Sequence, residues 1–325
     1  MPTVDVHCNN DKIWNLPKLI GFLSRHQHGR VTINVNPEAP DLSAVGLYDI
    51  LEKFQFESVE INTHNPFEQH GIYHINIKVG NEFLSHTPII NHSNHRWNRE
   101  RIFMTLFGRP TAARLAIAAH LYQCHRECSH IHFNSLPNDD NIELFEFDKL
   151  AQYEKSMLGP VAELVQNLPM TILPSKYDDF IKENIKTKGH AWITQIVEDP
   201  LTECYQDIFV DCVSESHVMG RTFFPTEKTT RPIWCKKPFV MFASKNYLAY
   251  LRQQGFRTFG DFWDETYDGY EGRERFLRIQ DLIDWIAGHS RDQLETMYWD
   301  MQYTLDHNYN LLLKQNYNNQ LTELS

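Results

Sequence analysis

Two short apolar runs restrict the fold of this chain more than any other feature. Residues 208–213 (IFVDCV) and 238–242 (PFVMF) are rich in β-branched and aromatic side chains, which is typical of buried strands. The segment between them begins with a polar turn and is long enough to hold a helix. Strand, polar turn, helix and strand form the α/β unit of a parallel sheet, in which ligands bind at the carboxyl ends of the strands. Ser214 and Glu215 follow the first run, so we expect them at a ligand-binding edge.

The polar segment between the two runs contains the sequence Thr226-Glu227-Lys228-Thr229. At a strand-to-helix turn, Glu227 can accept hydrogen bonds from ribose hydroxyls, while Lys228 can reach a phosphate as a point charge. The alternative interpretation is a surface ion pair that closes the N-terminus of a helix. The tripeptide taken alone favours this second interpretation.

The order of these motifs resembles the donor-binding half of α1,3-fucosyltransferase-type glycosyltransferases. The shared features are VSES, a short spacer, F-x-Thr-Glu-Lys, a helix-length gap and an apolar strand, and the similarity covers residues 103–121 and 209–261. The later segment GFRTFGDFWDETYD is similar instead to segments of uncharacterised phage and marine bacterial proteins that also carry Thr-Glu-Lys-Thr. The resemblance implies two Rossmann-like domains facing a cleft, the GT-B arrangement, with a C-terminal helix that crosses back to the first domain.

The resemblance also implies an activity, which is sugar transfer from a nucleoside-diphosphate sugar to an acceptor hydroxyl, with inversion at the sugar carbon and without a metal. Such a displacement needs cations that stabilise the leaving diphosphate and a base that takes the hydroxyl proton. Lys228 is expected to act as one cation and Glu227 to hold the ribose. Thr226, Ser214 and Glu215 are expected beside the bound donor.

A second strand–turn–helix unit supplies the other predicted donor-binding residues. Apolar residues 101–107 precede the turn Gly108-Arg109-Pro110 and a helix over residues 112–124. Amides at a helix N-terminus and a nearby arginine form a typical setting for a phosphate group. The resemblance implies that Arg114 reaches the donor diphosphate, with Gly108 and Arg109 in the turn beside it and Arg109 as the second choice of cation. The alternative is that Arg114 is a cation on the helix surface.

The general base is expected in the first domain, because the resembled family takes a carboxylate from there. Acidic and amide side chains gather in two turns that follow predicted strands of this domain, although such residues also form turns without any further role. We choose Glu38 as the base among three candidates, Glu38, Asp41 and Glu68.

The alternation of strands and helices predicts the domain organisation, and 325 residues are enough for two hydrophobic cores. We expect an acceptor-side α/β domain over residues 1–97 and a donor-binding domain over residues 98–290, with an insertion at about 134–200. The C-terminal helix is expected over residues 291–325, with Ser290 as its N-cap. Within the first domain we predict strands at 4–7, 30–35, 58–63 and 71–79, and helices at 16–25 and 46–54.

The helix after Arg114 carries residues that could suggest zinc. His120, Cys124 and Cys128 follow one another at spacings of four residues, with His130 and His132 just beyond. A Cys and a His four residues apart on an apolar helix are more often packing residues, and the Cys-x3-Cys pair has no second ligand pair nearby. The acids of residues 261–268 fit helix capping better than metal binding. We therefore expect no metal, and no cofactor apart from the donor substrate.

The charge composition of the chain limits the classes of binding partner that we expect. The net charge of −11 argues against sequence-independent binding to nucleic acid. One alternative function is nevertheless a phage-type enzyme that glycosylates a hydroxymethylated base in DNA, with Arg96, Arg99 and Arg101 as its basic patch. The other is a non-catalytic binding or scaffold protein that kept a nucleotide-sugar fold.

The expected location is cytoplasmic, in a phage or bacterial setting. The six cysteines are scattered through apolar runs, as is typical of reduced core thiols. No stretch approaches the ~20 consecutive apolar residues of a membrane span. The N-terminal residues carry neither the basic start nor the apolar centre of a signal peptide, so we expect no membrane partner.

Overall fold

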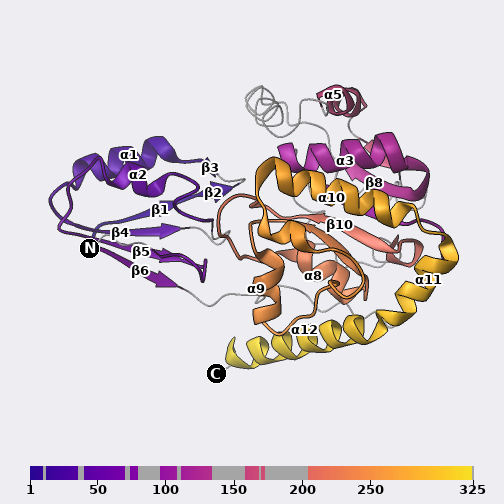
Figure 1. Cartoon of the computed structure of the whole chain (residues 1–325). Coiled ribbons are helices and arrows are strands. Elements are labelled where there is room, and N and C mark those ends of the chain that lie inside the picture. Colours follow the sequence, from indigo (N-terminus) through magenta and orange to yellow (C-terminus); the bar gives the residue numbers. More distant parts are fainter. Residues whose placement is uncertain are drawn as a thin grey trace, which may run out of the picture.

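The structure is a computed structural model in which two separate sheets each carry their own hydrophobic core (Figure 1). It describes residues 1–9, 12–35, 40–69, 74–79, 96–107, 111–133, 158–167, 170–172 and 204–323. We refer to the elements from β1 to β6 as the N-terminal unit and to those from β7 to α12 as the C-terminal unit. The predicted α/β class is confirmed, because both sheets are mainly parallel and are covered by helices.

The N-terminal sheet runs in one direction. Its parallel strands lie in the order β1 (Thr3–Val6), β4 (Arg30–Val35), β5 (Ser58–Thr63) and β6 (Ile75–Val79). Helices α1 (Leu16–Arg25) and α2 (Leu47–Leu51) lie on the same face of this sheet (Figure 1). A short antiparallel pair, β2 (Cys8–Asn9) and β3 (Lys12–Ile13), follows β1.

The two faces of the N-terminal sheet differ in chemistry because successive strand residues point to opposite sides. Along β5, half-buried and buried residues alternate, and the buried Val59 and Ile61 belong to the core under the helices. On the other face, Asp5, Asn34 and Asn62 are neighbours in the strand register. The Asn34 side-chain amide donates to Asp5 at 3.1 Å, and that of Asn62 donates to Asn34 at 2.8 Å. This face of the sheet therefore carries a row of polar side chains that are joined by hydrogen bonds.

The C-terminal sheet has the order β11 (Phe239–Phe242), β10 (Val210–Ser214), β7 (Phe103–Phe107), β8 (Ser129–Phe133) and β9 (Met170–Ile172). The strands are parallel except that β9 runs antiparallel to β8. Every residue of β7, β8, β10 and β11 is buried, which is typical of a parallel sheet covered on both faces.

Helices cover both faces of this sheet, as Figure 1 shows. Helices α3 (Ala112–His125) and α10 (Gly272–Ala287) lie on one face, and α8 (Glu227–Trp234) and α12 (Gln302–Glu323) lie on the other. Helix α5 (Leu158–Gln166) packs outside α3. The side chains of α3 are buried from Ala113 to Leu121, where the helix lies between the sheet and a further layer of helix.

The strand order reverses at β7. From β7 the chain passes through α3 to β8 on one side of β7, whereas β10 pairs with β7 on the other side. Helix α3 after β7 and helix α8 after β10 lie on opposite faces of the sheet (Figure 1). Open α/β sheets bind their ligands at such a reversal of strand order.

The two units touch through the loop that precedes α8. Arg221 donates its backbone amide to the carboxylate of Asp41 at 2.7 Å, and its carbonyl accepts from the Asn65 side chain at 2.9 Å. The backbone amide of Asp41 donates to the hydroxyl of Thr222 at 2.7 Å. Gly220 has a φ of +66°, and a Cβ there would lie 2.5 Å from Asp41, so the close approach requires glycine.

The C-terminal helical segment differs from the single long helix predicted from residue 291. It forms α11 (Arg291–Asp300) and α12, which meet at Met301. The chain changes direction at Met301, whose side chain is fully buried in the core of the C-terminal unit. Helix α12 packs against α8, and Asn308 bonds the backbone of Arg257 in the same unit. Its return to the first domain stays a prediction.

Strand β8 and helix α9 (Tyr247–Gln253) were not predicted from the sequence. The sequence of β8, Ser-His-Ile-His-Phe, reads as polar, yet all five residues are buried. Helix α2 is shorter than the predicted helix over residues 46–54, since residues 53 and 54 continue only as tighter turns. Within the described ranges, no helix has both the length and the apolar character that crossing a membrane requires.

Candidate functional site

The reversal point of the C-terminal sheet brings together six predicted site residues. They come from the first turns of α3, from the end of β10 and from the start of α8, and they are Arg114, Ser214, Glu215, Thr226, Glu227 and Lys228. Three other predicted residues, Gly108, Arg109 and Glu38, lie outside the described residues. The geometry of the six described residues gives the site its chemistry.

Lys228 places a positive charge at the beginning of α8. Thr226 is the N-cap of this helix, and its hydroxyl accepts from the Lys228 backbone amide at 3.2 Å. The ammonium folds back toward the cap, 3.1 Å from the Thr226 hydroxyl and 3.5 Å from the hydroxyl of Ser216. A helix N-terminus and an ammonium group both attract anions, so the two act on the same position.

Glu227 is the ionised partner of this lysine. One carboxylate oxygen lies 2.7 Å from the Lys228 ammonium, and the Glu227 side chain is 31 % exposed. Burial acts to raise the pKa of Glu227, but the charges of Lys228 and Arg231 outweigh it, so the pKa is lowered. The carboxylate thus remains an acceptor for hydroxyl groups at neutral pH. The Glu227–Lys228 ion pair of the alternative interpretation is therefore present, and it lies at the sheet edge where a ligand site is predicted.

The side chain of Glu215 is buried and connects two elements of the site. It is 3 % exposed, and its carboxylate accepts from the Thr226 amide at 3.1 Å and the Thr226 hydroxyl at 2.7 Å. It also accepts from the hydroxyl of Thr229 at 2.6 Å, which in turn lies 2.8 Å from the hydroxyl of Tyr247. These bonds attach the start of α8 to the end of β10. Glu215 therefore positions Lys228 and Glu227.

Arg114 is buried at the same place. It is 3 % exposed, so it is not the helix-surface cation of the alternative interpretation. One guanidinium nitrogen lies 3.4 Å from the carbonyl oxygens of Ser214 and Glu215. Thr111 caps α3 by accepting from the Arg114 amide at 3.3 Å. Arg114 thus links the first turn of α3 to the end of β10 and brings a cation to the reversal point.

The two described candidates for the general base have other partners. The carboxylate of Asp41 accepts from the amides of Ser43 and Ala44 as well as from Arg221. Glu68 is 8 % exposed, accepts from the Tyr48 hydroxyl at 2.7 Å, and has its pKa raised by burial. Both carboxylates shape the N-terminal unit and its contact with the loop before α8.

A buried charged cluster beneath α8 was not predicted. The Tyr205 hydroxyl donates to the carboxylate of Asp211 at 2.6 Å, and burial raises the pKa of Asp211 to about 6, against the opposing charge of Arg231. Arg231 lies on α8 and is 6 % exposed. The sequence signal was Asp211, a single acid inside the apolar run of β10. Arg231 of α8 thus places a positive charge near the buried Asp211 of β10.

Two of the three arginines of the predicted basic patch, Arg96 and Arg99, are paired with acids. Arg99 forms ion pairs with Asp292 and Glu295 of α11, and Arg96 lies 3.5 Å from Glu295. These pairs reduce the positive potential that binding to DNA would require. The structure therefore adds no support to the DNA-modifying alternative.

Asp268, in the segment from 261 to 268, caps a helix. Asp268 accepts from the backbone amides of Leu248 and Ala249 in the first turn of α9, both at 3.0 Å. Glu265 accepts from the Phe259 amide at 2.8 Å and from the Thr258 hydroxyl at 2.6 Å. These partners account for the two most buried acids of the segment.

Comparison with known proteins adds no assignment. The chain matches no protein-family model and no curated protein. A functional conclusion therefore depends on the site itself and on the motif resemblance described above.

Proposed function

We propose that this protein is a glycosyltransferase that moves a sugar from a nucleoside-diphosphate sugar to an acceptor hydroxyl. The observation that carries the proposal is the position of Lys228, at the N-terminus of α8 and at the point where the strand order reverses. Parallel α/β sheets bind nucleotides at this point, and a lysine beside helix amides is a typical phosphate-binding arrangement. The resemblance of the Thr-Glu-Lys motif points to the same class of donor.

In the proposed mechanism the diphosphate is the leaving group. Lys228, at the N-terminus of α8, stabilises the charge that develops on it as the bond to the sugar carbon breaks. Arg114 adds a second positive charge from the buried side of the site. Glu227 accepts hydrogen bonds from the ribose, and Glu215 holds the motif in place through Thr226 and Thr229.

The acceptor enters from the side of the N-terminal unit. A carboxylate there takes the proton of the attacking hydroxyl. The hydroxyl oxygen bonds to the sugar carbon on the face opposite the departing diphosphate, which inverts the configuration of that carbon. Glu38 remains our choice for this base, since Asp41 and Glu68 bond to neighbouring backbone and side-chain groups. The two cations supply the charge stabilisation that a metal ion supplies in other transferases, so the proposal includes no metal in the reaction.

Nucleotide binding tests the proposal directly. Purified protein is screened by thermal shift against GDP, UDP, CDP, ADP and dTDP, each with and without EDTA. A ligand at a hundred times its dissociation constant adds about 2.7 kcal/mol, which raises the melting temperature by several degrees. Lys228→Gln should abolish this rise. Lys236→Gln is the matched control, because Lys236 follows the other end of α8 and pairs with Asp306.

The result also separates the alternatives. A shift with one nucleotide that persists in EDTA, disappears in Lys228→Gln and remains in Lys236→Gln supports the donor site. Incubation of that nucleotide's sugar conjugates with glycan, peptide and hydroxymethylated DNA acceptors then distinguishes a transferase from a binding protein. No shift with any nucleotide would refute the proposal.

A further inference from the structure

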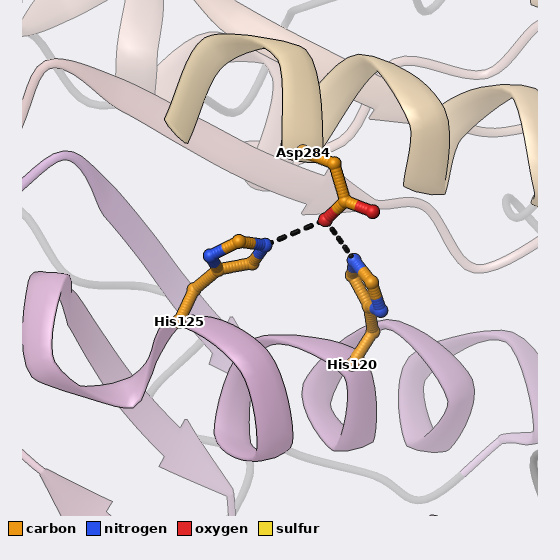
Figure 2. A group of neighbouring side chains, drawn as sticks. All are labelled: His120, His125 and Asp284. Carbon is orange, nitrogen blue, oxygen red and sulfur yellow. Dashed lines mark hydrogen bonds and ion pairs between the residues drawn. The ribbon is translucent and has the colours of Figure 1, made fainter. Parts of the chain in front are cut away.

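Two histidines and an aspartate meet where the end of α3 packs against α10, as Figure 2 shows. The Nε2 atoms of His120 and His125 lie 2.8 Å and 2.6 Å from the same carboxylate oxygen of Asp284. All three potential ligand atoms lie within 4.8 Å of one another. The side chains of His120 and His125 are only 10 % and 15 % exposed, whereas that of Asp284 is 53 % exposed. The cluster is thus partly enclosed and still accessible from one side.

The end of α3 explains how two histidines five residues apart face the same way. On a regular helix, residues i and i+4 share a face, so Cys124 would be the neighbour of His120. His125 is the last residue of α3, and its φ of −134° and ψ of 15° depart from helical values. The two imidazole rings come to 5.4 Å between centroids, at an angle of 73°. The change in backbone direction thus builds the pair.

We propose that His120, His125 and Asp284 bind one zinc ion between α3 and α10. Two imidazole nitrogens and one carboxylate oxygen are typical zinc ligands, and water completes a four-coordinate site. Zinc–nitrogen distances of about 2.0–2.1 Å in a tetrahedron put ligand atoms roughly 3.4 Å apart. The two nitrogen–oxygen distances, 2.8 Å and 2.6 Å, therefore have to lengthen by roughly 0.6 Å and 0.8 Å to admit the ion. Each ring presents its Nε2 lone pair to the ion and carries its proton on Nδ1.

This site differs from the one that the cysteine spacing suggested. His130 lies on β8, where its Nε2 is 3.3 Å from Asp207, and the thiol of Cys128 donates to the His125 carbonyl at 3.3 Å. The zinc site is also remote from the proposed donor site. Arg114 and His125 lie on the same helix eleven residues apart, which corresponds to about 16 Å along its axis. A bound zinc ion would thus join α3 and α10, and the zinc proposal does not rest on the proposed function.

Zinc titration of the full chain tests the proposal. The protein is stripped with EDTA, dialysed, and titrated with ZnCl₂ by calorimetry at pH 7.5. We expect one equivalent of zinc per chain in the wild type. Binding should weaken about tenfold or more in Asp284→Asn and His125→Gln. Both replacements can keep a hydrogen bond between the helices, so they separate a metal site from a hydrogen-bonded link.

Matched controls are needed because the chain has 17 histidines. Glu274→Gln removes an exposed carboxylate of α10 that pairs with Arg278, and His289→Gln removes a histidine just beyond the same helix. Both control variants should bind zinc like the wild type. Zinc should also raise the melting temperature of the wild type and of both controls, and Co²⁺ should give the visible bands of four-coordinate cobalt.

Two results would overturn the proposal. One is the absence of a saturable single equivalent of zinc in the wild type. The other is equal affinity in the wild type, Asp284→Asn and His125→Gln, which would show that zinc binds other histidines and that the cluster is only a hydrogen-bonded link. Circular dichroism establishes whether each variant is folded. If Asp284→Asn does not fold, the zinc affinity of His125→Gln alone decides between a metal site and a hydrogen-bonded link.

Discussion

The ring of Phe67 stacks on the ring of Tyr250, with centroids 3.6 Å apart and an angle of 16° between the planes. Phe67 belongs to the N-terminal unit and Tyr250 to α9 of the C-terminal unit, and the ring of Phe223 approaches both at an edge. Asn65, two residues before Phe67, donates the hydrogen bond to the Arg221 carbonyl. The two units are therefore joined by packed aromatic rings as well as by backbone contacts.

We predict that Phe67→Ala weakens the coupling between the units. Loss of the stacked pair should lower the free energy of unfolding by about 1–2 kcal/mol, because aromatic pairs contribute beyond the area they bury. Urea unfolding followed by fluorescence and by circular dichroism should then show two transitions that no longer coincide. Phe56→Ala is the control, since Phe56 packs within the N-terminal unit alone. Coincident transitions at the wild-type midpoint would contradict the prediction.

Glu215→Ala should destabilise the start of α8. The change leaves the Thr226 amide and the hydroxyls of Thr226 and Thr229 without their buried acceptor, at a cost of about 1–3 kcal/mol for an unmade bond. Glu215→Gln should recover part of the loss, since one amide oxygen still accepts. Chemical denaturation measures both variants. Equal stability of Glu215→Ala and wild type would show that the network does not hold α8.

The buried Lys237 should make stability depend on pH. Burial lowers its pKa to about 7, with Cys235 and Asp207 acting in the opposite direction, and its ammonium lies 4.9 Å from the centre of the Tyr298 ring. Between pH 7 and the ordinary lysine value, the unfolded chain binds a proton that the folded chain has released. Stability should therefore rise with pH in this window, by up to about 1.4 kcal/mol per pH unit from this group.

Lys237→Met tests this dependence. The variant should be more stable than the wild type at pH 7, because no ammonium has to be buried, and the difference should shrink toward pH 9.5. Denaturation midpoints across this range give the comparison. Lys236→Met is the neighbouring control, since the Lys236 ammonium is partly exposed and pairs with Asp306. A constant difference between Lys237→Met and wild type would refute the lowered pKa.

Ser290→Ala should remove the capping box of α11. The Ser290 hydroxyl accepts from the Gln293 amide at 3.2 Å, and the Gln293 side chain accepts from the Ser290 amide at 2.8 Å. Loss of such a cap costs about 1 kcal/mol. Thr296→Ala provides a control, because its hydroxyl only bonds the Asp292 carbonyl one turn back. A midpoint of thermal unfolding equal to that of the wild type would count against the cap.

Several elements were predictable because their signals are local. The bounds of α1, β4 and β5 match the predictions, since alternation and helical spacing are visible within a few residues. Ser290 was recognised as an N-cap from its place before a helical pattern. Strand β8 was missed because His130 and His132 read as polar, although both are buried beneath packed helices.

The site was predictable in part. Thr226, Glu227 and Lys228 lie at a helix start after a strand, as the motif indicated. The inward orientation of Glu215 was not predictable, because its partner Tyr247 comes from α9, far along the chain. The same holds for Arg114, whose burial depends on β10. A spacing rule suggested His120 with Cys124, whereas the structure pairs His120 with His125 and Asp284.

The sequence by itself determined several of the strands and helices, such as α1, β4 and β5, and the N-cap Ser290, because these properties follow from side chains close together in the chain. Only the tertiary structure decided that β10 pairs with β7 on the side opposite β8, and hence that Arg114 and Lys228 meet at a reversal point. Strand order depends on how whole layers bury their apolar faces against one another. That competition involves residues distant in sequence, so no local pattern records its outcome.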